Sequence, residues 1–368
     1  MNTTTPRLFV AATQQNDGKT TASLGLFSSL KKRIGRIGFI KPVGQRFIDV
    51  DGQRIDEDSV LIDHTFNVHT PIEAMSPIAV EPDFTRRYIE HPNPDFFVKR
   101  IRHSFDRAAW EKDFVIIEGT GHAGVGSVFD LSNARVAQIL HSKVLLMTGG
   151  GIGRPIDEIV LNKALFDREG VEVIGVVLNK VLPEKFEQVA EFARRGLERL
   201  GIDLLGVLPL VPTLANATLG QMCKQMKGHF INAENRSRRR VRKVIIGAMN
   251  SAHVMGYFDP GTLIITPGDR EDIILAALST ASVGDADGKC IAGLALSGDL
   301  LPQESVLDLL KNSTIPTIAT PLDSYTAANC IYSMTVKTLP GDSDKIDTIQ
   351  ALVEKHVEVD RLLEKLRA

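Results

Sequence analysis

Short apolar runs alternate with stretches of helical apolar spacing through the first two-thirds of this 368-residue chain. The runs are apolar at consecutive positions and too short for helices, so they predict parallel strands that are buried on both faces. Alternation of strand and helix predicts a doubly wound α/β sheet, whose ligands bind beyond the carboxyl ends of the strands. The expected strands are Leu8–Ala12, Ile37–Ile40, Phe114–Ile117, Val144–Met147, Val173–Leu178 and Leu204–Leu208, and the expected helices are Lys19–Lys32, Phe97–Ala109, Asn133–Leu140, Ile156–Phe166 and Phe186–Leu200.

A second, smaller α/β unit is expected after the first domain, which we place at residues 1–212. Residues 213–243 form the expected linker, and its end, Arg236–Lys243, carries six positive charges in eight positions. Basic charge without interleaved aromatic residues is typical of a solvated linker or a contact between subunits rather than of a nucleic-acid site. In residues 244–343 the expected strands are 244–246, 262–266, 291–296 and 317–319, with helices at 271–281, 305–310 and 325–331; residues 344–368 are expected to form amphipathic helices.

The balance of charge excludes a general polyanion-binding surface. The chain has 43 Lys and Arg against 45 Asp and Glu, so we expect no nucleic-acid partner and no membrane partner. Its three cysteines are far apart and lack metal-ligand spacing, and the start lacks the pattern of a secretory signal. We therefore expect a soluble protein in the reducing cytoplasm, with Cys290 and Cys330 as buried packing residues.

The loop after the first expected strand has the composition of a phosphate-binding loop. Phosphates need backbone N–H groups at a helix N-terminus, a glycine, a lysine ammonium and a hydroxyl for Mg²⁺, and Gly18, Lys19 and Thr20 supply the last three in order. The strict G-x-x-x-x-G-K-[ST] pattern fails, because Thr13 stands where the first glycine belongs. A helix that happens to start with Gly-Lys-Thr is the alternative. The predicted nucleotide-binding residues in this loop are Thr13, Asn16, Asp17, Gly18, Lys19, Thr20 and Thr21.

Two further strand ends strengthen the prediction. Lys41 follows the second strand, and Glu118 follows the next one in the pattern with glycines behind it. A carboxylate in that place is suited to hold Mg²⁺ through oxygen ligands. Each residue taken singly could be a solvated strand end, but three such residues at equivalent strand ends predict one common site.

These residues resemble the motifs of dethiobiotin synthetase and related P-loop amidoligases over residues 6–210. The resemblance rests on the loop Ala12–Thr20, on Lys41-Pro42-Val43, on Asp58-Ser59-Val60-Leu61 and on Glu118-Gly119-Thr120-Gly121. It implies that ATP and Mg²⁺ are held by Lys19 and by the metal residues Thr20, Asp58 and Glu118. It also implies that Lys19 and Lys41 are the catalytic candidates, and that Asn179 lies against the adenine.

Nearly the whole chain also resembles the amino-terminal part of long-form phosphate acetyltransferase. The motifs are the glycine-rich stretch Glu118–Ala134, Thr148–Pro155 and Pro212-Thr213-Leu214, followed by Pro260–Leu263 and Thr266–Asp272 of a DRTGG domain. This resemblance implies a regulatory and oligomerising region, and hence a homo-oligomer such as a dimer. We expect no acetyltransferase activity, because the sequence ends at Ala368. The residues after Glu118 depart from the dethiobiotin synthetase pattern, so diaminopelargonate is not the expected substrate.

Several other polar residues carry open alternatives. His122 is either a ligand contact or an ordinary loop histidine, and Gly149–Gly153 either holds an anion or provides tight turns. Arg154 is expected to pair with Asp157. Asp269 and Arg270 are expected to line a subunit or domain contact.

Three functions follow from these observations. The first is a Mg-ATP-binding P-loop protein that acts as a nucleotide-responsive regulatory or assembly module, with an unidentified small metabolite as a further ligand. The second is an ATP-dependent carboxylate-activating ligase, in which Lys19 and Lys41 neutralise the charge of a moving phosphoryl group. The third is a scaffold whose nucleotide site is vestigial.

Overall fold

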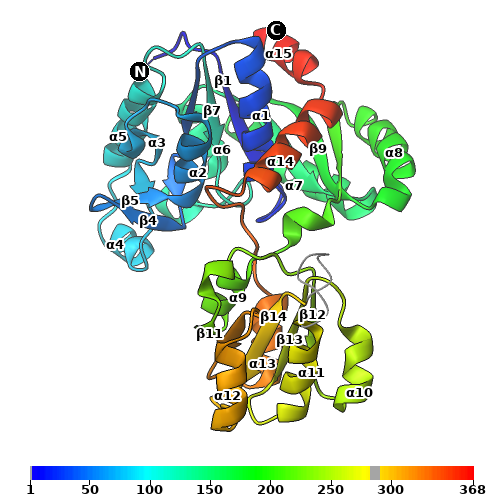
Figure 1. Ribbon diagram of the computed structural model, residues 1–368. Coiled ribbons are helices and arrows are strands. Elements are labelled where there is room, and N and C mark those ends of the chain that lie inside the picture. The colour runs from blue at the N-terminus through cyan, green and yellow to red at the C-terminus, as the bar shows by residue number, and fades with distance from the viewer. Residues whose placement is uncertain (1, 282–290) are drawn as a thin grey trace. The chain divides into compact units, whose positions relative to one another are not determined.

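The computed structural model describes residues 2–281 and 291–368 and divides into two compact units (Figure 1). Unit 1 comprises Met1–Val211 and Thr338–Ala368, and unit 2 comprises Pro212–Lys337. No helix of the described ranges is long and apolar enough to cross a membrane.

Unit 1 is built on a six-stranded sheet with the order β10-β9-β8-β1-β7-β2, in which all neighbours are parallel. This confirms the predicted doubly wound α/β fold. Every residue of β1 and β7 is buried, as expected for central strands covered on both faces. The strands are β1 (Arg7–Ala12), β2 (Ile37–Ile40), β7 (Phe114–Glu118), β8 (Lys143–Gly149), β9 (Val173–Val181) and β10 (Leu204–Pro209).

Helices cover both faces of this sheet. One face packs against α5 (Pro94–Ala108), α6 (Asn133–Ile139), α7 (Gly153–Arg168) and α8 (Phe186–Glu198), and the other against α1 (Lys19–Arg33), α2 (Glu57–Phe66), α14 (Ser343–His356) and α15 (Val359–Arg367). At the edge beyond β2 lie the short elements β3 (Val43–Gly44), β4 (Phe47–Val50), β5 (Gln53–Asp56), α3 (Ile72–Met75), β6 (Ile78–Ala79) and α4 (Phe84–Glu90).

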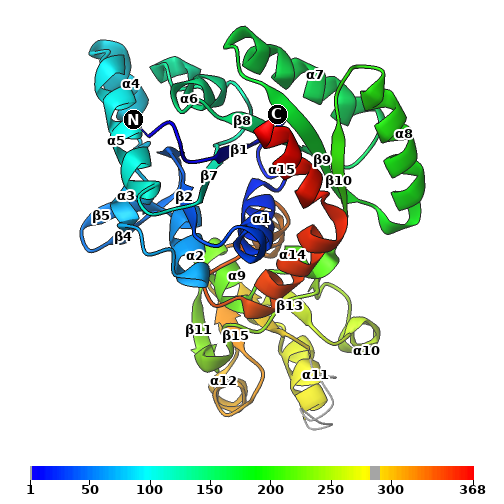
Figure 2. The ribbon, with the colours of Figure 1, turned by 90° about the horizontal axis from the view of Figure 1, so that it is seen from above.

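The two terminal helices belong to unit 1. Figure 2 shows α14 and α15 beside α1, the helix that follows the phosphate loop. Gly25 of α1 allows the close approach, because a Cβ at this position would lie 2.2 Å from Cγ2 of Val353. Arg33 also donates to Asp360 at 2.9 Å. Sandwiched between the sheet and α14, α1 is buried over most of its length.

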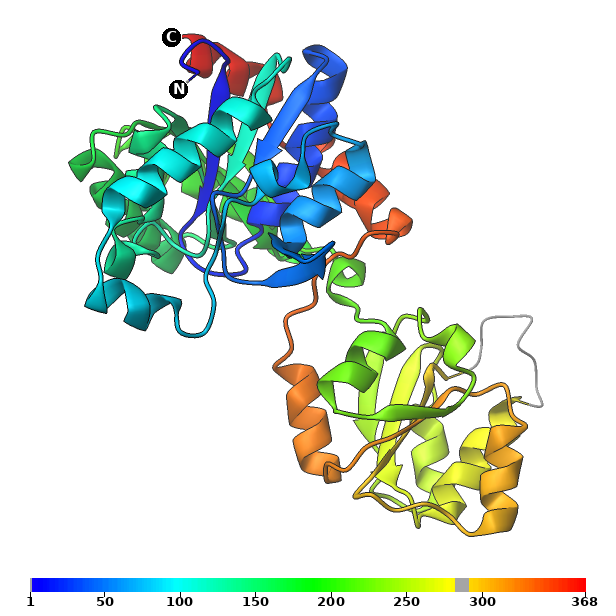
Figure 3. The same ribbon diagram turned by 90° about the vertical axis from the view of Figure 1, so that its left-hand side faces the viewer.

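Unit 2 contains a five-stranded sheet with the order β11-β15-β14-β13-β12, in which only β11 is antiparallel to its neighbour. The strands are β11 (His229–Asn232), β12 (Lys243–Ile246), β13 (Thr262–Pro267), β14 (Gly293–Ser297) and β15 (Thr317–Ala319). Helices α9 (Leu219–Gln225) and α13 (Ser324–Tyr332) cover one face, and α10 (Ser251–Val254), α11 (Glu271–Ala281) and α12 (Glu304–Lys311) cover the other (Figure 3).

Residues 213–243, the expected linker, instead form part of unit 2. Helix α9 starts with a capping box between Thr218 and Gln221, and it buries Leu219 and Met222 in the core. The basic run pairs with the start of this helix, since Leu219 N donates to Arg239 O at 2.9 Å. The segment was misjudged because its helix and edge strand are too short for a clear periodic pattern. Short 3₁₀ turns lie at Ser127–Phe129, Pro183–Lys185, Pro212–Ala215, Glu234–Arg236 and Met255–Tyr257.

Candidate functional site

The carboxyl ends of three adjacent strands bring the predicted residues together. In the order β1-β7-β2, the loop 13–18 follows β1, Glu118 ends β7, and Lys41 follows β2. Residues far apart in sequence therefore meet at one sheet edge, directly before the N-terminus of α1. This edge is where ligands bind in parallel α/β sheets.

The loop between β1 and α1 is held in a defined conformation. Gly18 has a φ of 101°, and a Cβ at this position would lie 2.0 Å from Nδ2 of Asn179. A larger residue at position 18 would therefore be strained by the backbone angle and would have to displace the Asn179 amide. The Asn179 amide donates to the carbonyl of Asp17 at 2.9 Å, and Lys180 donates to the carbonyl of Asn16 at 2.7 Å.

Thr13 organises the start of the loop. Its hydroxyl lies 2.8 Å from Asp17 Oδ2 and 2.9 Å from Thr148 Oγ1, while the backbone N–H of Gln14 donates to Asp17 at 2.8 Å. The Gln14 side chain donates to Glu158 of α7 at 2.6 Å. Thr13 thus has a structural role in the place of the missing first glycine. The half-buried Thr21 lies in the first turn of α1.

The Lys19 ammonium is turned toward the loop and is buried. It donates to Gly121 O at 2.9 Å and to Gln14 O at 3.4 Å. Burial lowers the pKa of Lys19 to about 8, despite the opposing effect of the nearby Glu118 charge. A buried ammonium whose partners are mainly neutral carbonyl groups is well suited to accept an anionic ligand.

Lys41 lies at the centre of three buried carboxylates. Its Nζ is 3.3 Å from Asp56 and 3.2 Å from Glu118, and it also pairs with Asp58. Burial opposes the charged ammonium, but the three carboxylates outweigh it and raise the pKa of Lys41 well above its ordinary value. Asp56 was missed in the sequence, although it caps α2 by accepting from Asp58 N at 2.9 Å and could have been found by its place before that helix.

Glu118 joins the phosphate loop to the Lys41 cluster. Its Oε1 accepts from Thr20 Oγ1 at 3.1 Å and from Lys41 at 3.2 Å, whereas its buried Oε2 accepts no hydrogen bond from the residues that the structure describes. Burial raises the pKa of Glu118 above its ordinary value, although Lys41 acts in the opposite direction. Within residues 2–281 and 291–368, no three His, Cys, Asp or Glu side chains are arranged to hold a metal alone.

Two buried asparagines support the loop after β7. Asn133 accepts from Thr120 N at 2.9 Å and donates to His122 O at 2.6 Å. Asn162 accepts from Ala123 N at 2.9 Å and donates to Thr13 O at 3.2 Å, which ties this loop to the phosphate loop. The sequence reasoning assigned no role to either residue. Their side chains recognise backbone groups from distant segments, and no local pattern reports such contacts.

The remaining expectations have mixed outcomes. His122 is exposed and accepts from Gly124 N at 3.1 Å, and Gly151 has a φ of 140° in a tight turn. Arg154 pairs with Glu158 at 2.6 Å instead of Asp157, because residues four apart lie on the same face of a helix.

Two expectations concern unit 2. Arg270 donates to Met249 O at 2.8 Å and pairs with Asp272 inside this unit, while Asp269 is exposed, so their predicted contact role stays a prediction. Cys330 is only half-buried, which corrects the expectation of a buried residue, and Cys290 lies outside the described residues.

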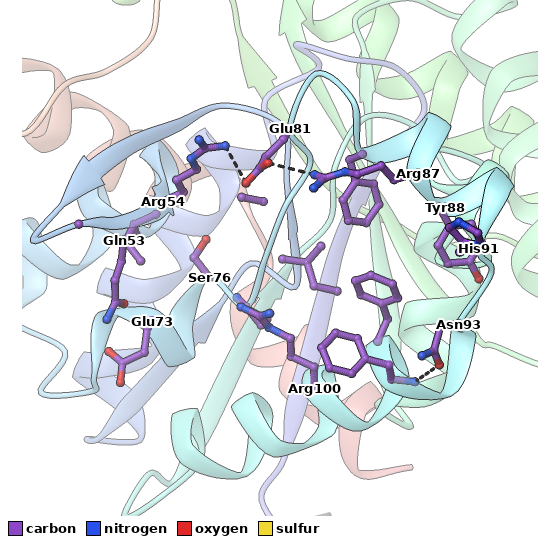
Figure 4. Close-up of a pocket in the computed structure, with 18 residues that line it drawn as sticks. Gln53, Arg54, Glu73, Ser76, Glu81, Arg87, Tyr88, His91, Asn93 and Arg100 are labelled. Carbon is purple, nitrogen blue, oxygen red and sulfur yellow. Dashed lines mark hydrogen bonds and ion pairs between the residues drawn. The ribbon is translucent and has the colours of Figure 1, made fainter.

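A separate cavity of about 960 Å³ lies beside β4, β5, α3, α4 and α5 (Figure 4). Ser76, which lines it, accepts from Asp56 N at 2.9 Å. Strand β6, whose Ile78 also lines the cavity, pairs with Val43 of β3, directly after the Lys41 loop. The cavity therefore shares part of its wall with the elements that hold the Lys41 cluster.

Comparison with protein families agrees with this geometry. Residues 6–218 match the family described as AAA domain. The chain belongs to this family. Residues 221–334 match the DRTGG domain family, so the AAA domain and the DRTGG domain follow each other along the sequence.

Curated relatives align with this chain over both the AAA domain and the DRTGG domain. The chain is 28% identical to phosphate acetyltransferase of Pseudomonas aeruginosa over 97% of its own length and 51% of the relative's. It is 25% identical to phosphate acetyltransferase of a Synechocystis strain, over 99% of this chain and 52% of the relative. The resemblance to the amino-terminal part of these proteins is confirmed, and the chain spans about half the length of the curated relatives it matches.

Solved structures give more distant matches. The cell division protein MinD of Aquifex aeolicus is 14% identical, with a TM-score of 0.37 over 57% of this chain and 84% of that chain. The CBS and DRTGG domains of a Clostridium perfringens pyrophosphatase, complexed with diadenosine tetraphosphate, are 21% identical, with a TM-score of 0.27 over 39% of this chain and 62% of that chain.

Proposed function

We propose that the AAA domain binds Mg-ATP at the loop 13–20 and that the chain acts as a nucleotide-responsive regulatory or assembly module. The observation that carries the proposal is the buried carboxylate of Glu118, which accepts from the Thr20 hydroxyl and whose Oε2 meets no donor at hydrogen-bond distance and angle in the described chain. Against the larger effect of burial, the Ser23 hydroxyl acts on the same carboxylate and lowers its pKa. A buried acceptor of this kind is costly unless a ligand or an ordered water completes it.

The phosphates would be bound by the N-terminus of α1 and by Lys19. Gly18 supplies the left-handed backbone angle directly before α1, and the ammonium of Lys19 now contacts two carbonyl oxygens that phosphate oxygens could replace. An anion beside Lys19 would favour its charged form and so reverse the effect of burial on its pKa.

Magnesium fits the oxygen ligands on the other side of the phosphates. Mg²⁺ keeps several waters and is bound through one or two protein oxygens together with substrate phosphates, so a complete protein cage is not required. Thr20 and Glu118 are the residues that would hold the ion. Asp58 would contribute indirectly, because it pairs with Lys41, which also contacts Glu118. The ion would supply positive charge that neutralises the triphosphate.

Lys41 is better suited to hold the neighbouring carboxylates in place than to take part in phosphoryl transfer. Its ammonium is enclosed by three carboxylates, whereas that of Lys19 contacts carbonyl groups. A lysine that neutralises a moving phosphoryl group needs access to it, so this enclosure favours the binding module over the carboxylate-activating ligase. The proposal includes a cytoplasmic homo-oligomer, as the resemblance to long-form phosphate acetyltransferase implies.

Nucleotide titrations test the site directly. In a thermal-shift experiment confirmed by calorimetry, Mg-ATP should stabilise the wild type, and Lys19→Ala should remove this effect. Glu118→Gln should retain some ATP binding but lose its dependence on Mg²⁺. The control is Lys163→Ala on α7, whose side chain pairs only at the surface with Asp167. Equal stabilisation of the wild type and Lys19→Ala would reject the site.

A further inference from the structure

The cavity beside the β4–β5 hairpin combines positive charge with an aromatic wall. Of its 18 lining residues, none belongs to the loop 13–20 or is Lys41 or Glu118. A volume of about 960 Å³ lies in the range of small-molecule sites, and such sites join an apolar lining to a few polar groups. Its chemistry therefore indicates the class of ligand.

One carboxylate bridges two arginines across the cavity. Figure 4 shows Glu81 between Arg54 and Arg87, with one oxygen 2.6 Å from Arg54 and the other 3.0 Å from Arg87. The side chains of Arg54 and Arg87 are 50% and 62% exposed. Two guanidinium groups that share one carboxylate retain donors for a second anion.

A third arginine, Arg100 of α5, lines a different part of the same cavity (Figure 4). Arg100 lines the cavity and makes no hydrogen bond or ion pair with the part of the chain that is described (Figure 4). The other acidic residue in the lining, Glu73, is already paired with Arg107 at 2.6 Å, and this hydrogen bond holds the pKa of Glu73 below its ordinary value. The cavity thus has an excess of positive charge that its own carboxylates leave uncompensated.

The apolar wall consists of aromatic rings. Phe97 is in edge contact with Phe84 at 5.4 Å and with Phe96 at 5.2 Å between ring centroids. Phe96 remains 51% exposed although it lines the cavity. An exposed ring next to ring edges offers a surface on which a flat apolar group can stack.

We propose that this cavity binds a small organic anion that has a carboxylate or phosphate head and an apolar body. The arginines of the lining, Arg54, Arg87 and Arg100, provide the positive charge that attracts the head, and the body lies on the wall formed by Phe84, Phe96 and Phe97. This ligand is distinct from the nucleotide of the AAA domain, and the inference stands whether or not the loop 13–20 binds ATP.

Glu81 is expected to compete only weakly with a bound anion for Arg54 and Arg87. Exposed ion pairs contribute little to stability, so the bridge restrains the two arginines only weakly. Guanidinium groups bind carboxylate and phosphate through paired hydrogen bonds, which favours an oxyanion over a neutral group in this place. The negative charge of Glu81 repels an incoming anion, so its removal should strengthen binding.

Calorimetric titration of the full chain tests the inference with four probes. Phenyl phosphate and phenylacetate carry both features, inorganic phosphate carries only the charge, and 2-phenylethanol carries only the ring. We expect saturable binding of phenyl phosphate or phenylacetate at one site, at least about tenfold tighter than either single-feature probe, since a hydrogen bond to a charged group contributes about 1.5 kcal/mol or more. Whichever of phenyl phosphate and phenylacetate binds more tightly shows whether the natural ligand has a phosphate or a carboxylate head.

Variants then locate the binding. Arg100→Gln should weaken the tighter of the two aromatic anions about tenfold, whereas Glu81→Gln should tighten it. The matched control, Arg102→Gln, changes an exposed arginine on the same helix outside the cavity lining and should have no effect. Circular dichroism of each variant verifies folding. Absence of saturable binding at millimolar concentration, equal affinity for a single-feature probe, or equal effects of Arg100→Gln and Arg102→Gln would overturn the inference, as would weaker binding in Glu81→Gln.

Discussion

Replacing Lys41 by Met would leave three buried carboxylates without their shared counter-ion. Lys41 Nζ lies 3.3 Å from Asp56 and 3.2 Å from Glu118 and also pairs with Asp58. Breaking one buried ion pair costs about 3–5 kcal/mol, because the remaining charge stays desolvated. Since all three partners are less than 6% exposed at the side chain, we expect a loss near the upper end, about 4–5 kcal/mol in the free energy of unfolding at pH 8.

The stability lost through Lys41→Met should be larger at high pH than at low pH. Burial already raises the pKa of Glu118, and Lys41 acts against this rise, so the substitution should raise that pKa further. A carboxyl group whose pKa is higher in the folded state than in the unfolded state reduces stability as pH rises from its unfolded value through its folded value. Lys41→Met should therefore be less destabilising at pH 5 than at pH 8.

Urea unfolding followed by circular dichroism at pH 5, 6, 7 and 8 measures both effects. Lys163→Met is the control, since its surface pair with Asp167 at 2.7 Å contributes only about 0.3–0.5 kcal/mol. The double variant Lys41→Met/Asp58→Asn should recover part of the loss, because one unpaired charge is removed. A loss below about 1 kcal/mol at pH 8, or one that is the same at all four pH values, would refute the reasoning.

Three further predictions concern the same domain. Because burial lowers the pKa of Lys19 to about 8, the affinity for Mg-ATP should fall as the pH rises above 8. Binding above this pH should be accompanied by proton uptake, which calorimetry in buffers of different ionisation enthalpy detects. A constant affinity between pH 7 and 9 would contradict this prediction. Gly25→Ala should destabilise the protein by about 1–3 kcal/mol through its clash with Val353, and adding Val353→Ala should reduce that loss, so a double-mutant cycle with additive effects would contradict the contact. Asn133→Ala should cost about 1–3 kcal/mol in urea unfolding because Thr120 N–H loses its acceptor, and an unchanged midpoint would count against that role.

The sequence predicted the strands of the main sheet of unit 1 to within two residues, except at the end of β9, whereas the short strands β3, β4, β5 and β6 were not predicted. Continuous apolar runs such as Phe114–Ile117 leave little choice, because a segment this short and this apolar must be buried on both faces. Prediction was poorer where elements were short. Helix α9 and strand β11 were taken for a linker, since four to seven residues contain too few turns or alternations to show a period.

The choice of side-chain partner was the other source of error. Lys41 and Glu118 were expected at one edge, but Asp56 was not expected to join them, and Glu158 rather than Asp157 was found beside Arg154. The first contact depends on the path of the chain beyond β2, and the second on the helical period of α7, which places Arg154 and Glu158 on one face. The cavity beside the β4–β5 hairpin was not predicted at all, because its lining residues come from several elements, β5, α3, α4 and α5, that are separate in the sequence.

Local chemistry thus specified the alternation of strands and helices, the glycine and lysine of the phosphate loop, and the polar residues that follow β2 and β7. These features are encoded within a few consecutive residues, where backbone geometry and burial period act directly. Strand order determined which of these residues became neighbours, and therefore the charge balance around Lys41, the unpartnered oxygen of Glu118 and the return of α14 onto α1. Such contacts depend on packing between segments more than 70 residues apart, as for Lys41 and Glu118, and no short stretch of sequence contains that information.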